Sequence, residues 1–405
     1  MPTLVGPNTF GEENLVFGYD LGDVKNSYKG EPAYNRHDYD KSVMSQTGFD
    51  NWSCYDGNYT ASYHTWNIAQ SKTLTNIPGP DGKYTNAMLY YNFDGGFYGP
   101  TDWGGVPAAI CTTGNKITLQ AWVKAADAGS IEKTVTPYMY FSLNAGGAEA
   151  TSTNYTLTAD WQLVSHTHTM SANATNSNNI LYFFTQNSGA VRMYLTKTAV
   201  LSGTGHAVQW LPGGQTRSVT QGLIDLTGNS TIDLTDVSFD SNAQMTFDGT
   251  NDSAPIGTVG NYSDNITCEA IFRTTSGATW KNIISGGCGD IIFTVNGNVL
   301  NFGAQCNSPI PHANYSTTVV NTGAWFHAVA TYNGAQVKIY INGILENTYT
   351  RSGTFTPGVL RVGSNNAGSS EFFNGDLPLV KVYNRALTAT EVASNYKAIK
   401  GRFNI

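Results

Sequence analysis

Three Asn-Gly pairs, each lying between strand-like runs, constrain the fold of this chain more than any other feature. Asn333-Gly334 separates "WFHAVATY" from "AQVKIYI", Asn342-Gly343 separates "VKIYI" from "ILENTYT", and Asn296-Gly297 adds a third pair. Asn-Gly readily supplies the two residues with positive φ that a type I′ turn needs, so each pair predicts a β-hairpin. The C-terminal half is therefore expected to be antiparallel β-structure.

Alternation of apolar and polar residues, which is typical of half-buried strands, also runs through the middle of the chain. It is clear in "KITLQAWVKAA" (Lys116–Ala126), "WQLVSHTHTM" (Trp161–Met170) and "AVRMYLTKTAVL" (Ala190–Leu201). "NITCEAIFRTTSG" (Asn265–Gly277) repeats the pattern of the first of these runs. The repetition predicts two related sandwiches in tandem.

We therefore predict an all-β fold of two tandem antiparallel jelly-roll sandwiches, with an extended N-terminal arm and a short C-terminal helix. Thr388 and Glu391 form a capping box that predicts the helix start, and Gly401 is expected to end it. Asn374-Gly375 predicts a turn before the last strand. The predicted segments are the arm (1–45), the first sandwich (46–208), a Pro-Gly-Gly linker (209–218) and the second sandwich with the helix (219–405).

The composition argues against nucleic acid as a partner and against insertion into a membrane. Charged residues make up 13 % of the 405 residues and the net charge is −7, whereas phosphate binding needs concentrated Lys and Arg, so nucleic acid is not expected as a partner. No stretch approaches the roughly 20 apolar residues of a membrane span, so membrane insertion is not expected. The first residues have neither a basic region nor an apolar run, unlike a secretory signal.

The five cysteines are Cys54, Cys111, Cys268, Cys288 and Cys306. Their odd number and irregular spacing predict neither a disulfide framework nor a paired metal site. We expect buried free thiols, as in a protein made in a reducing cytoplasm, with a single bridge among the last three as the alternative.

The C-terminal region resembles the laminin-G-like, concanavalin-A-like jelly roll over roughly residues 219–400. This family resemblance implies a sandwich, often with one Ca²⁺. The matching motifs, in family order, are "GLIDLTGN" (Gly222–Asn229), "FDGTNDS" (Phe247–Ser253), "WFHAVATYNGAQVKIYINGIL" (Trp325–Leu345), "LRVGS" (Leu360–Ser364) and "FNGDLPLVKVYNRALTATEV" (Phe373–Val392).

Two further resemblances concern the rest of the chain. "LTADWQLVSHTHTM" followed by "GAVRMYLTKTAVLSGTGHAVQWLPGG" is similar to carbohydrate-binding modules of the family 4/9 type, which are also jelly rolls. "ENLVFGYDLGDVKNSYKGEPAYN" (Glu13–Asn35) resembles the start of virion structural proteins of marine tailed phages, including cyanophages. Those proteins often pair this arm with a laminin-G-like domain. The resemblance implies a phage particle protein, made in the host cytoplasm and located in the virion.

Sugar binding is the first candidate activity. Sugars stack on aromatic rings, and neighbouring polar groups bind their hydroxyls. Two aromatic stretches, "NWSCYDGNYTASYHTW" and "YYNFDGGFYGPTDWGG", offer Trp52, Tyr59, Tyr98 and Trp103 as carbohydrate-binding residues. The alternative is that these aromatic residues fill the core of the first sandwich or a protein interface.

Calcium is the second candidate ligand, and it is the only cofactor that we expect. Asp248, Asn251 and Asp252 supply oxygen atoms at short spacing, and hard cations prefer oxygen ligands. The alternative is a turn that is stabilised by Asx hydrogen bonds.

Catalysis is not expected. Glycoside hydrolysis needs two carboxylates across the scissile bond, but no Glu-x-Asp-x-x-Glu pattern is present, and Glu269 stands singly in "TCEAIFRT" as a solvent-face residue. Cys288 in "SGGCGD" is expected to be a buried cysteine beside a turn. His166 and His168 share one face of a strand and could bind a transition metal, but no third ligand is evident, so we expect them on the solvent face.

These expectations combine into one function, with two alternatives. We expect a virion structural protein, either a peripheral fibre or adhesin or a head-decoration appendage, that binds cell-surface polysaccharide through its lectin-like domains. Its arm would join other virion proteins, and the chain would form a homo-oligomer, with a trimer as our expectation. The alternatives are a polysaccharide depolymerase on the same scaffold and a purely structural capsid or tail component.

Overall fold

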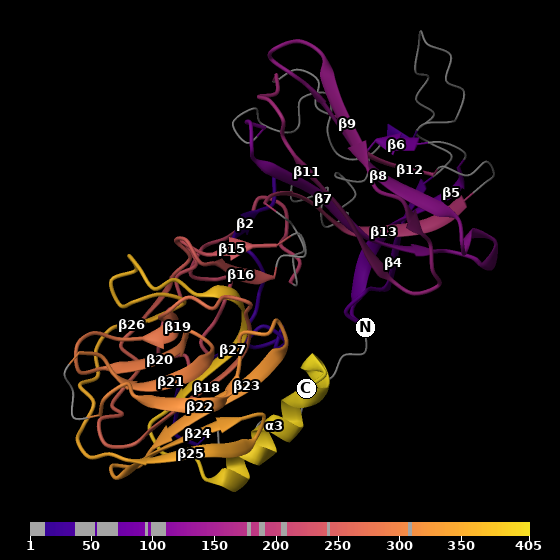
Figure 1. The fold of residues 1–405 in the computed structure, drawn as a ribbon. Coiled ribbons are helices and arrows are strands. Elements are labelled where there is room, and N and C mark those ends of the chain that lie inside the picture. The colour runs from indigo at the N-terminus through magenta and orange to yellow at the C-terminus, as the bar shows by residue number, and fades with distance from the viewer. Residues whose placement is uncertain are drawn as a thin grey trace. The chain divides into compact units, whose positions relative to one another are not determined.

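The protein consists of two compact units of antiparallel β-sheet, which confirms the predicted all-β class (Figure 1). The C-terminal unit comprises residues 1–30, 219–240 and 244–405, and the central unit comprises residues 31–218 and 241–243. The computed structural model describes residues 13–36, 53–54, 72–93, 96–98, 111–175, 180–185, 191–203, 209–240, 244–306 and 310–405.

The first sheet of the C-terminal unit has eight strands in the order β15-β16-β27-β18-β23-β24-β25, with β1 also paired to β27. The strands are β1 (Leu15–Asp20), β15 (Ser238–Phe239), β16 (Met245–Asp248), β18 (Ile266–Arg273), β23 (Trp325–Tyr332), β24 (Gln336–Ile341), β25 (Ile344–Thr350) and β27 (Asn374–Tyr383).

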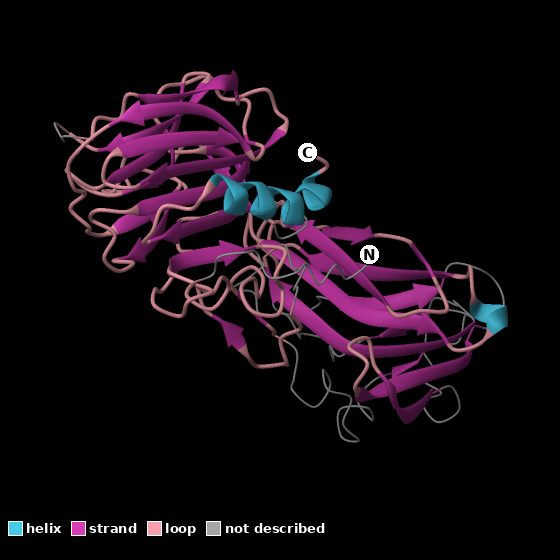
Figure 2. Ribbon diagram, turned by 90° about the horizontal axis from the view of Figure 1, so that it is seen from below, coloured by secondary structure: helices cyan, strands magenta, loops and turns pink. Residues whose placement is uncertain are grey.

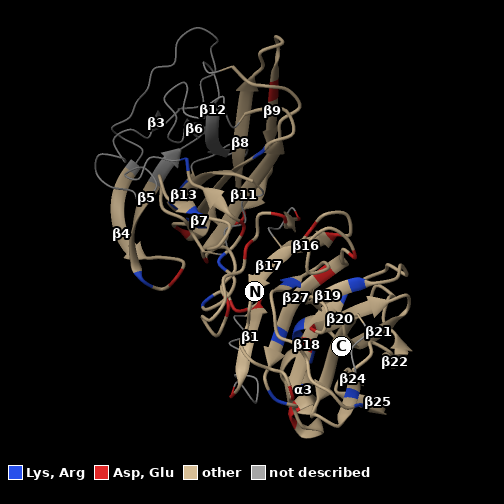
Figure 3. Cartoon of the chain, turned by 90° about the vertical axis from the view of Figure 1, so that its left-hand side faces the viewer, with Lys and Arg blue, Asp and Glu red and all other residues tan. Residues whose placement is uncertain are grey.

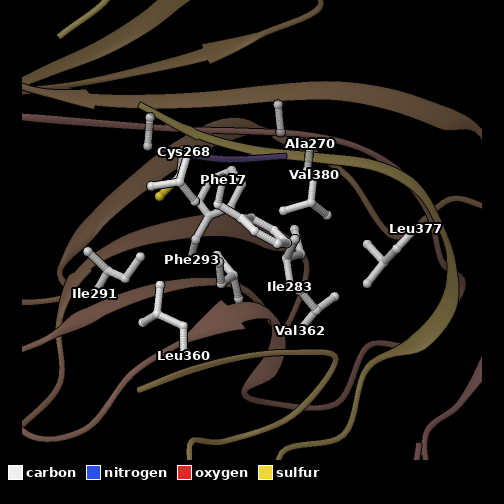
Figure 4. Close-up of a cluster of buried hydrophobic side chains, with 14 of the residues drawn as sticks. Phe17, Cys268, Ala270, Ile283, Ile291, Phe293, Leu360, Val362, Leu377 and Val380 are labelled. Atoms are coloured by element: carbon white, nitrogen blue, oxygen red, sulfur yellow. The ribbon is translucent and has the colours of Figure 1, made fainter. Parts of the chain in front are cut away.

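The second sheet of this unit has six strands in the order β17-β26-β19-β20-β21-β22. They are β17 (Ala254–Gly257), β19 (Lys281–Ser285), β20 (Ile291–Asn296), β21 (Val299–Ala304), β22 (Asn314–Val319) and β26 (Leu360–Val362). Large apolar side chains of β18, β20, β26 and β27 meet between the two sheets and form the core (Figure 4).

The three predicted hairpins are present, but only one has the predicted turn. Asn342 and Gly343 both have positive φ, 50° and 76°, as a type I′ turn between β24 and β25 requires. Asn296 ends β20 instead, so the turn residues are Gly297 (φ 64°) and Asn298. Positive φ at the first turn residue only is the type II′ pattern.

Asn374-Gly375 is not the predicted turn but the beginning of β27, where it pairs with Asp248 and Phe247 of β16. A Cβ atom at Gly375 would lie 2.0 Å from the carbonyl oxygen of Arg273. The glycine is therefore needed for close approach of two backbones inside the sheet rather than for a reversal of the chain.

The N-terminal segment takes a place that differs from the separate arm predicted for residues 1–45. Leu15–Asp20 form β1 and pair antiparallel with Leu379–Tyr383 of β27. Phe17 is fully buried among core side chains of this unit, beside Cys268 and Val380 (Figure 4). Since Tyr19 is also buried, β1 is part of the sandwich core and not an arm that waits for a neighbour.

Helix α3 (Ala389–Phe403) follows β27 and packs on the outer face of the first sheet (Figure 2). The predicted capping box of Thr388 and Glu391 is confirmed. The predicted end at Gly401 is wrong, because the helix continues to Phe403 and ends at Asn404 with φ 56°. Arg402 near this end donates two hydrogen bonds of 2.5 and 2.6 Å to Asp20 of β1.

The central unit contains a five-stranded sheet in the order β11-β7-β13-β5-β4 and a six-stranded sheet in the order β10-β8-β12-β6-β3, with β9 paired to β8. A short pair, β2 (Ala33–Tyr34) with β14 (Thr216–Arg217), completes it. The other strands are β3 (Ser53–Cys54), β4 (Lys72–Pro78), β5 (Tyr84–Phe93), β6 (Gly96–Tyr98), β7 (Lys116–Ala125), β8 (Thr134–Ser142), β9 (Ala148–Ser152), β10 (Tyr155–Thr156), β11 (Gln162–Thr169), β12 (Ile180–Thr185) and β13 (Val191–Ser202), with a 3₁₀ turn at Ala128–Ser130.

Charged residues are sparse and of mixed sign across the described strands (Figure 3). Within the described ranges, no helix has both the length and the apolar character needed to cross a membrane.

Candidate functional site on the outer face of the second sheet

The candidate site lies on the outer face of the second sheet of the C-terminal unit. In β20, Ile291, Phe293 and Val295 point into the core. Successive side chains of a strand alternate between faces, so Ile292 and Thr294 point outward. Thr294 is nevertheless fully buried, which means that other groups cover this face.

A row of polar side chains crosses the outer face. The register places Asn282 of β19 opposite Thr294, Thr294 opposite Asn301 of β21, and Asn301 opposite Tyr315 of β22. Asn282, Thr294 and Asn301 are all fully buried. None of the four side chains in the row carries a charge at neutral pH.

Two amides of this row have polar atoms without a hydrogen-bond partner. They are both side-chain atoms of Asn301, Oδ1 and Nδ2, and Oδ1 of Asn282. A buried polar group without a partner costs about 1–3 kcal/mol. Buried water commonly satisfies such groups in native structures.

Two aromatic rings meet over this face. Trp280 lies directly before β19, and the ring of His312 lies 4.9 Å from its ring, centre to centre, at an interplanar angle of 87°. His312 belongs to the segment that crosses β21, since a Cβ atom at Gly303 would lie 2.5 Å from the Cα atom of His312. Trp280 and His312 thus approach from opposite ends of the face, and Thr294 and Asn301 lie between those ends.

The backbone at the rim of the face adopts an uncommon conformation. Trp280 and Glu371 have φ of 54° and 58°, in the left-handed region that bulky residues rarely occupy. Glu371 binds Asn282 twice: its carbonyl oxygen accepts from the backbone N–H at 3.1 Å, and its carboxylate accepts from Nδ2 at 2.7 Å. Residues held in such conformations cluster at ligand sites, because the surrounding structure must support them.

A second row runs beside the first and contains an arginine. Arg361 of β26 is opposite Ser285 of β19, which is opposite Ile292 of β20. The Arg361 guanidinium donates to the carbonyl oxygen of Asn366 at 3.0 Å and to Ser253 Oγ at 3.1 Å. It is therefore held toward the loops at one edge of the face.

A disulfide lies at the end of the same sheet. Cys288 and Cys306 are bonded and exposed, so the expectation of a buried free thiol at Cys288 is wrong, and the alternative of a single bridge holds. Backbone hydrogen bonds bring the two segments together, from Gly289 N–H to the carbonyl oxygen of Gln305 at 3.0 Å. Cys111 and Cys268 are buried free thiols, as expected.

Of the predicted sugar-binding residues, Trp52, Tyr59 and Trp103 lie outside the described residues. Tyr98 ends β6, where only the backbone is described. Its backbone pairs with Ser53 and Tyr182. The prediction of a sugar site in the central unit therefore stays a prediction.

The predicted calcium ligands lie in a tight turn after β16. Asp248 Oδ1 accepts from the N–H groups of Thr250 at 2.7 Å and Asn251 at 3.2 Å, which is an Asx turn. Asp252 accepts from Ser238 N–H and Oγ and from Asp248 N–H, and burial raises its pKa. Each carboxylate thus already has protein donors, and calcium binding here stays a prediction.

Glu269 is not the solvent-face residue that was expected. It is buried beneath α3, where its carboxylate accepts from His327 Nε2 at 2.8 Å, Tyr383 OH at 3.1 Å and Asn395 Nδ2 at 3.0 Å. Burial alone would raise its pKa, but the hydrogen bond and charge of His327 lower it. Glu269 therefore anchors the helix and is closed to a substrate.

His166 and His168 of β11 are not on the solvent face either. Both ring nitrogens of His166 lie within hydrogen-bond distance of threonine hydroxyls, Thr151 at 2.9 Å and Thr153 at 2.7 Å. His168 pairs with Glu149 at 3.2 Å. Among the residues with a described position, no group of three or more His, Cys, Asp or Glu is arranged to hold a metal ion.

Residues 248–393, which include the whole polar row, match the sequence model of the family described as the concanavalin A-like lectin/glucanases superfamily. This part of the chain is similar to concanavalin A-like lectin domains. The match covers less than half of the chain, so it describes this domain only. A comparison with curated protein sequences finds no match.

Comparison with solved structures finds distant likenesses. The binding domain of botulinum neurotoxin serotype D is 12 % identical, with a TM-score of 0.34 over 45 % of this chain and 49 % of that one. Domain 4 of the arabinanase AbnA from Geobacillus stearothermophilus, solved with arabinotriose, is 17 % identical, with a TM-score of 0.34 over 44 % of this chain and 93 % of that one. The chain thus spans about half the length of the neurotoxin domain, and these likenesses carry no functional argument.

Proposed function

We propose that this protein is a virion structural protein that binds glycans, as a peripheral fibre or adhesin or as a head-decoration appendage. Its glycan site is the outer face of the second sheet in the lectin domain. The observation that carries the proposal is the match of residues 248–393 to the family described as the concanavalin A-like lectin/glucanases superfamily. The rings of Trp280 and His312 meet on the same face.

The chemistry of this face suits a sugar. A pyranose ring presents C–H groups that stack on an aromatic face and hydroxyls that both donate and accept hydrogen bonds. Trp280 and His312 supply the aromatic surface, and Tyr315, which is 37 % exposed, supplies a hydroxyl. Sites for small ligands commonly combine aromatic side chains with a few fixed polar groups in this way.

The virion part of the proposal rests on the sequence resemblance of Glu13–Asn35 to phage particle proteins. Because Phe17 and Tyr19 are buried in their own unit, contact with other virion proteins would use parts of the arm outside β1. A homo-oligomer, with a trimer as the expected state, and calcium at Asp248, Asn251 and Asp252 remain part of this proposal.

The test is a glycan array that includes host envelope polysaccharide, probed with the full chain with and without Ca²⁺. Trp280→Ala and His312→Ala should each lose at least tenfold in affinity. Tyr84→Ala, the same kind of substitution at an exposed aromatic residue of β5 in the central unit, serves as the matched control and should bind normally.

Other outcomes would favour the alternatives. Release of reducing sugar from the polysaccharide would indicate a depolymerase. Absence of glycan binding, together with tight binding to purified particles, would indicate a purely structural component. Glycan binding that survives both substitutions would move the site away from this face and toward the central unit.

A further inference from the structure

We propose that the disulfide between Cys288 and Cys306 is a redox switch, which small thiols open and small disulfides close while the C-terminal unit stays folded. The switch would operate whether or not the protein binds glycans. Three features support it: both cysteines are exposed, other hydrogen bonds hold their two segments together, and the thiols of Cys111 and Cys268 are buried.

The bridge lies on the surface at one end of the second sheet, where Cys288 and Cys306 are both exposed. Cys288 stands in "SGGCGD", so its two neighbours, Gly287 and Gly289, have no side chain to shield its sulfur. Gly289 has φ 82°, and a Cβ atom there would lie 3.1 Å from Thr356 Oγ1, so a larger residue is disfavoured at this position. Exposed disulfides are the ones that an external thiolate reaches.

The two bridged segments are also held together by hydrogen bonds that involve no sulfur atom. The Gly289 N–H donates to the carbonyl oxygen of Gln305 at 3.0 Å, and the Gln305 N–H donates to the carbonyl oxygen of Asp290 at 2.9 Å. The buried Asp290 carboxylate accepts from Tyr262 OH at 2.6 Å and from Gly358 N–H at 2.9 Å. Opening the bridge should therefore leave the two thiols close enough to bond again, since their Cα atoms are 5.2 Å apart.

The buried cysteines are poor partners for exchange with this bridge. Cys111 and Cys268 are both fully buried. Burial raises the pKa of the Cys111 thiol to about 11, and it raises the pKa of the Cys268 thiol as well. Since the thiolate is the form that attacks a disulfide, neither thiol is expected to rearrange the bridge at neutral pH.

The opening reaction balances with two molecules of a small thiol such as glutathione. The thiolate of the first attacks one sulfur of the bridge, the S–S bond breaks, and the other cysteine leaves as a thiolate, which takes up the proton that the glutathione lost. The thiolate of the second attacks the mixed disulfide and releases the second cysteine in the same way, together with oxidised glutathione. The bridge gains two electrons and the two glutathione molecules lose them, and the reverse sequence closes the bridge.

Opening the bridge should loosen the two segments locally. The N–H groups of Gly289 and Gln305 both donate to the facing segment, next to the bridge. Cys306 has φ 61°, in the left-handed region that residues with a Cβ atom rarely adopt, and the open form lets it relax. Without the crosslink these hydrogen bonds should open more often, so that their amide protons exchange faster with solvent.

The experiment incubates the folded full chain in buffers that differ in the ratio of reduced to oxidised glutathione. Alkylation followed by mass spectrometry of the peptides that contain Cys288 and Cys306 gives the open fraction, and NMR follows amide hydrogen exchange in the same samples. We expect reversible opening with an unchanged far-UV circular dichroism spectrum. Exchange at Gly289 and Gln305 should be at least about tenfold faster in the open form.

Two controls accompany this measurement. The double variant Cys288→Ser, Cys306→Ser should show the faster exchange at every glutathione ratio. The N–H of Asn342, which donates to the carbonyl oxygen of His327 at 2.8 Å in the first sheet, should exchange at the same rate in both forms.

Three results would overturn the switch. The first is a bridge that opens only in urea, or whose opening unfolds the C-terminal unit. The second is alkylation of both cysteines at every glutathione ratio, because no bridge then forms. The third is equal exchange at Gly289 and Gln305 in the open and closed forms, because the bridge then controls nothing in the fold.

Discussion

Replacing Asn301 with leucine tests the central physical statement, which is that its amide makes no hydrogen bond in the free protein. Leucine has nearly the shape of asparagine but needs no partner. The side chain is fully buried, and both of its polar atoms lack partners. Removing a buried unsatisfied group should therefore stabilise the unliganded protein, whereas most core substitutions destabilise.

The expected gain follows from the cost of an unsatisfied buried group, about 1–3 kcal/mol. For a domain of this size, each kcal/mol shifts the melting temperature by about 2–4 °C. We expect the melting temperature of the C-terminal unit to rise by about 2–12 °C. Calorimetry of the full chain measures this effect.

Asn314→Leu is the matched control, because it makes the same substitution in the neighbouring strand with the opposite expectation. Asn314 is also fully buried and its Oδ1 has no partner, but its Nδ2 donates to the carbonyl oxygens of Phe302 and Pro311, both at 2.8 Å. Replacing it removes this donor from two carbonyl groups and should destabilise by about 1–3 kcal/mol. If Asn301→Leu destabilises as Asn314→Leu does, Asn301 has a partner in the free protein, and the reasoning is refuted.

Three further predictions concern the scaffold. Phe17→Ala should destabilise the C-terminal unit by about 3–5 kcal/mol, because Phe17 is fully buried in its core, and a calorimetric transition that does not move would contradict the role of β1. Burial lowers the pKa of His166 to about 4, below its usual value of about 6.5. The folded protein therefore loses about 3 kcal/mol of stability as the pH falls from 6.5 toward 4, because the unfolded chain binds the proton first. Urea midpoints at pH 7 and pH 4.5 would measure that loss, and His166→Gln should reduce it. Mutating Cys288 and Cys306 together to serine should destabilise the C-terminal unit by about 3 kcal/mol, since the bridge closes a loop with a sequence separation of 18. Equal urea midpoints with and without a reducing agent would show that the bridge is absent in solution.

Features that depend on neighbours in sequence were predictable. The hairpins follow from Asn-Gly pairs, and the start of α3 follows from Thr388 and Glu391, because turns and caps are formed by a few consecutive residues. The turn type at Asn296 and the end of α3 were missed. β20 includes Asn296, which was expected to lie in the turn, and α3 extends two residues beyond Gly401.

Features that depend on distant pairing were not predictable. β1 pairs with β27, more than 350 residues later, and nothing in "LVFGYD" identifies that partner. Glu269 looked like a solvent-face residue because it lies in an alternating strand, and only the packing of α3 over the sheet buries it. The disulfide required knowledge that β20 and β21 place Cys288 beside Gln305.

Almost no sequence pattern indicated the candidate site. A polar residue at an outward position of a strand, such as Thr294 or Asn301, reads as an exposed residue. The covering by Trp280 and His312 depends on two loops whose path the sequence does not reveal. The one available hint was Trp280, a tryptophan directly before the apolar run "NIIS" of β19.

The most direct test is a two-dimensional NMR titration of the ¹⁵N-labelled full chain. The ligand is the oligosaccharide that binds most tightly on the glycan array. The side-chain amide of Asn301 and the indole N–H of Trp280 are followed together. The account predicts that both signals shift and saturate with one dissociation constant. Saturable binding that leaves both signals unmoved, or that shifts only residues of the central unit, would contradict it.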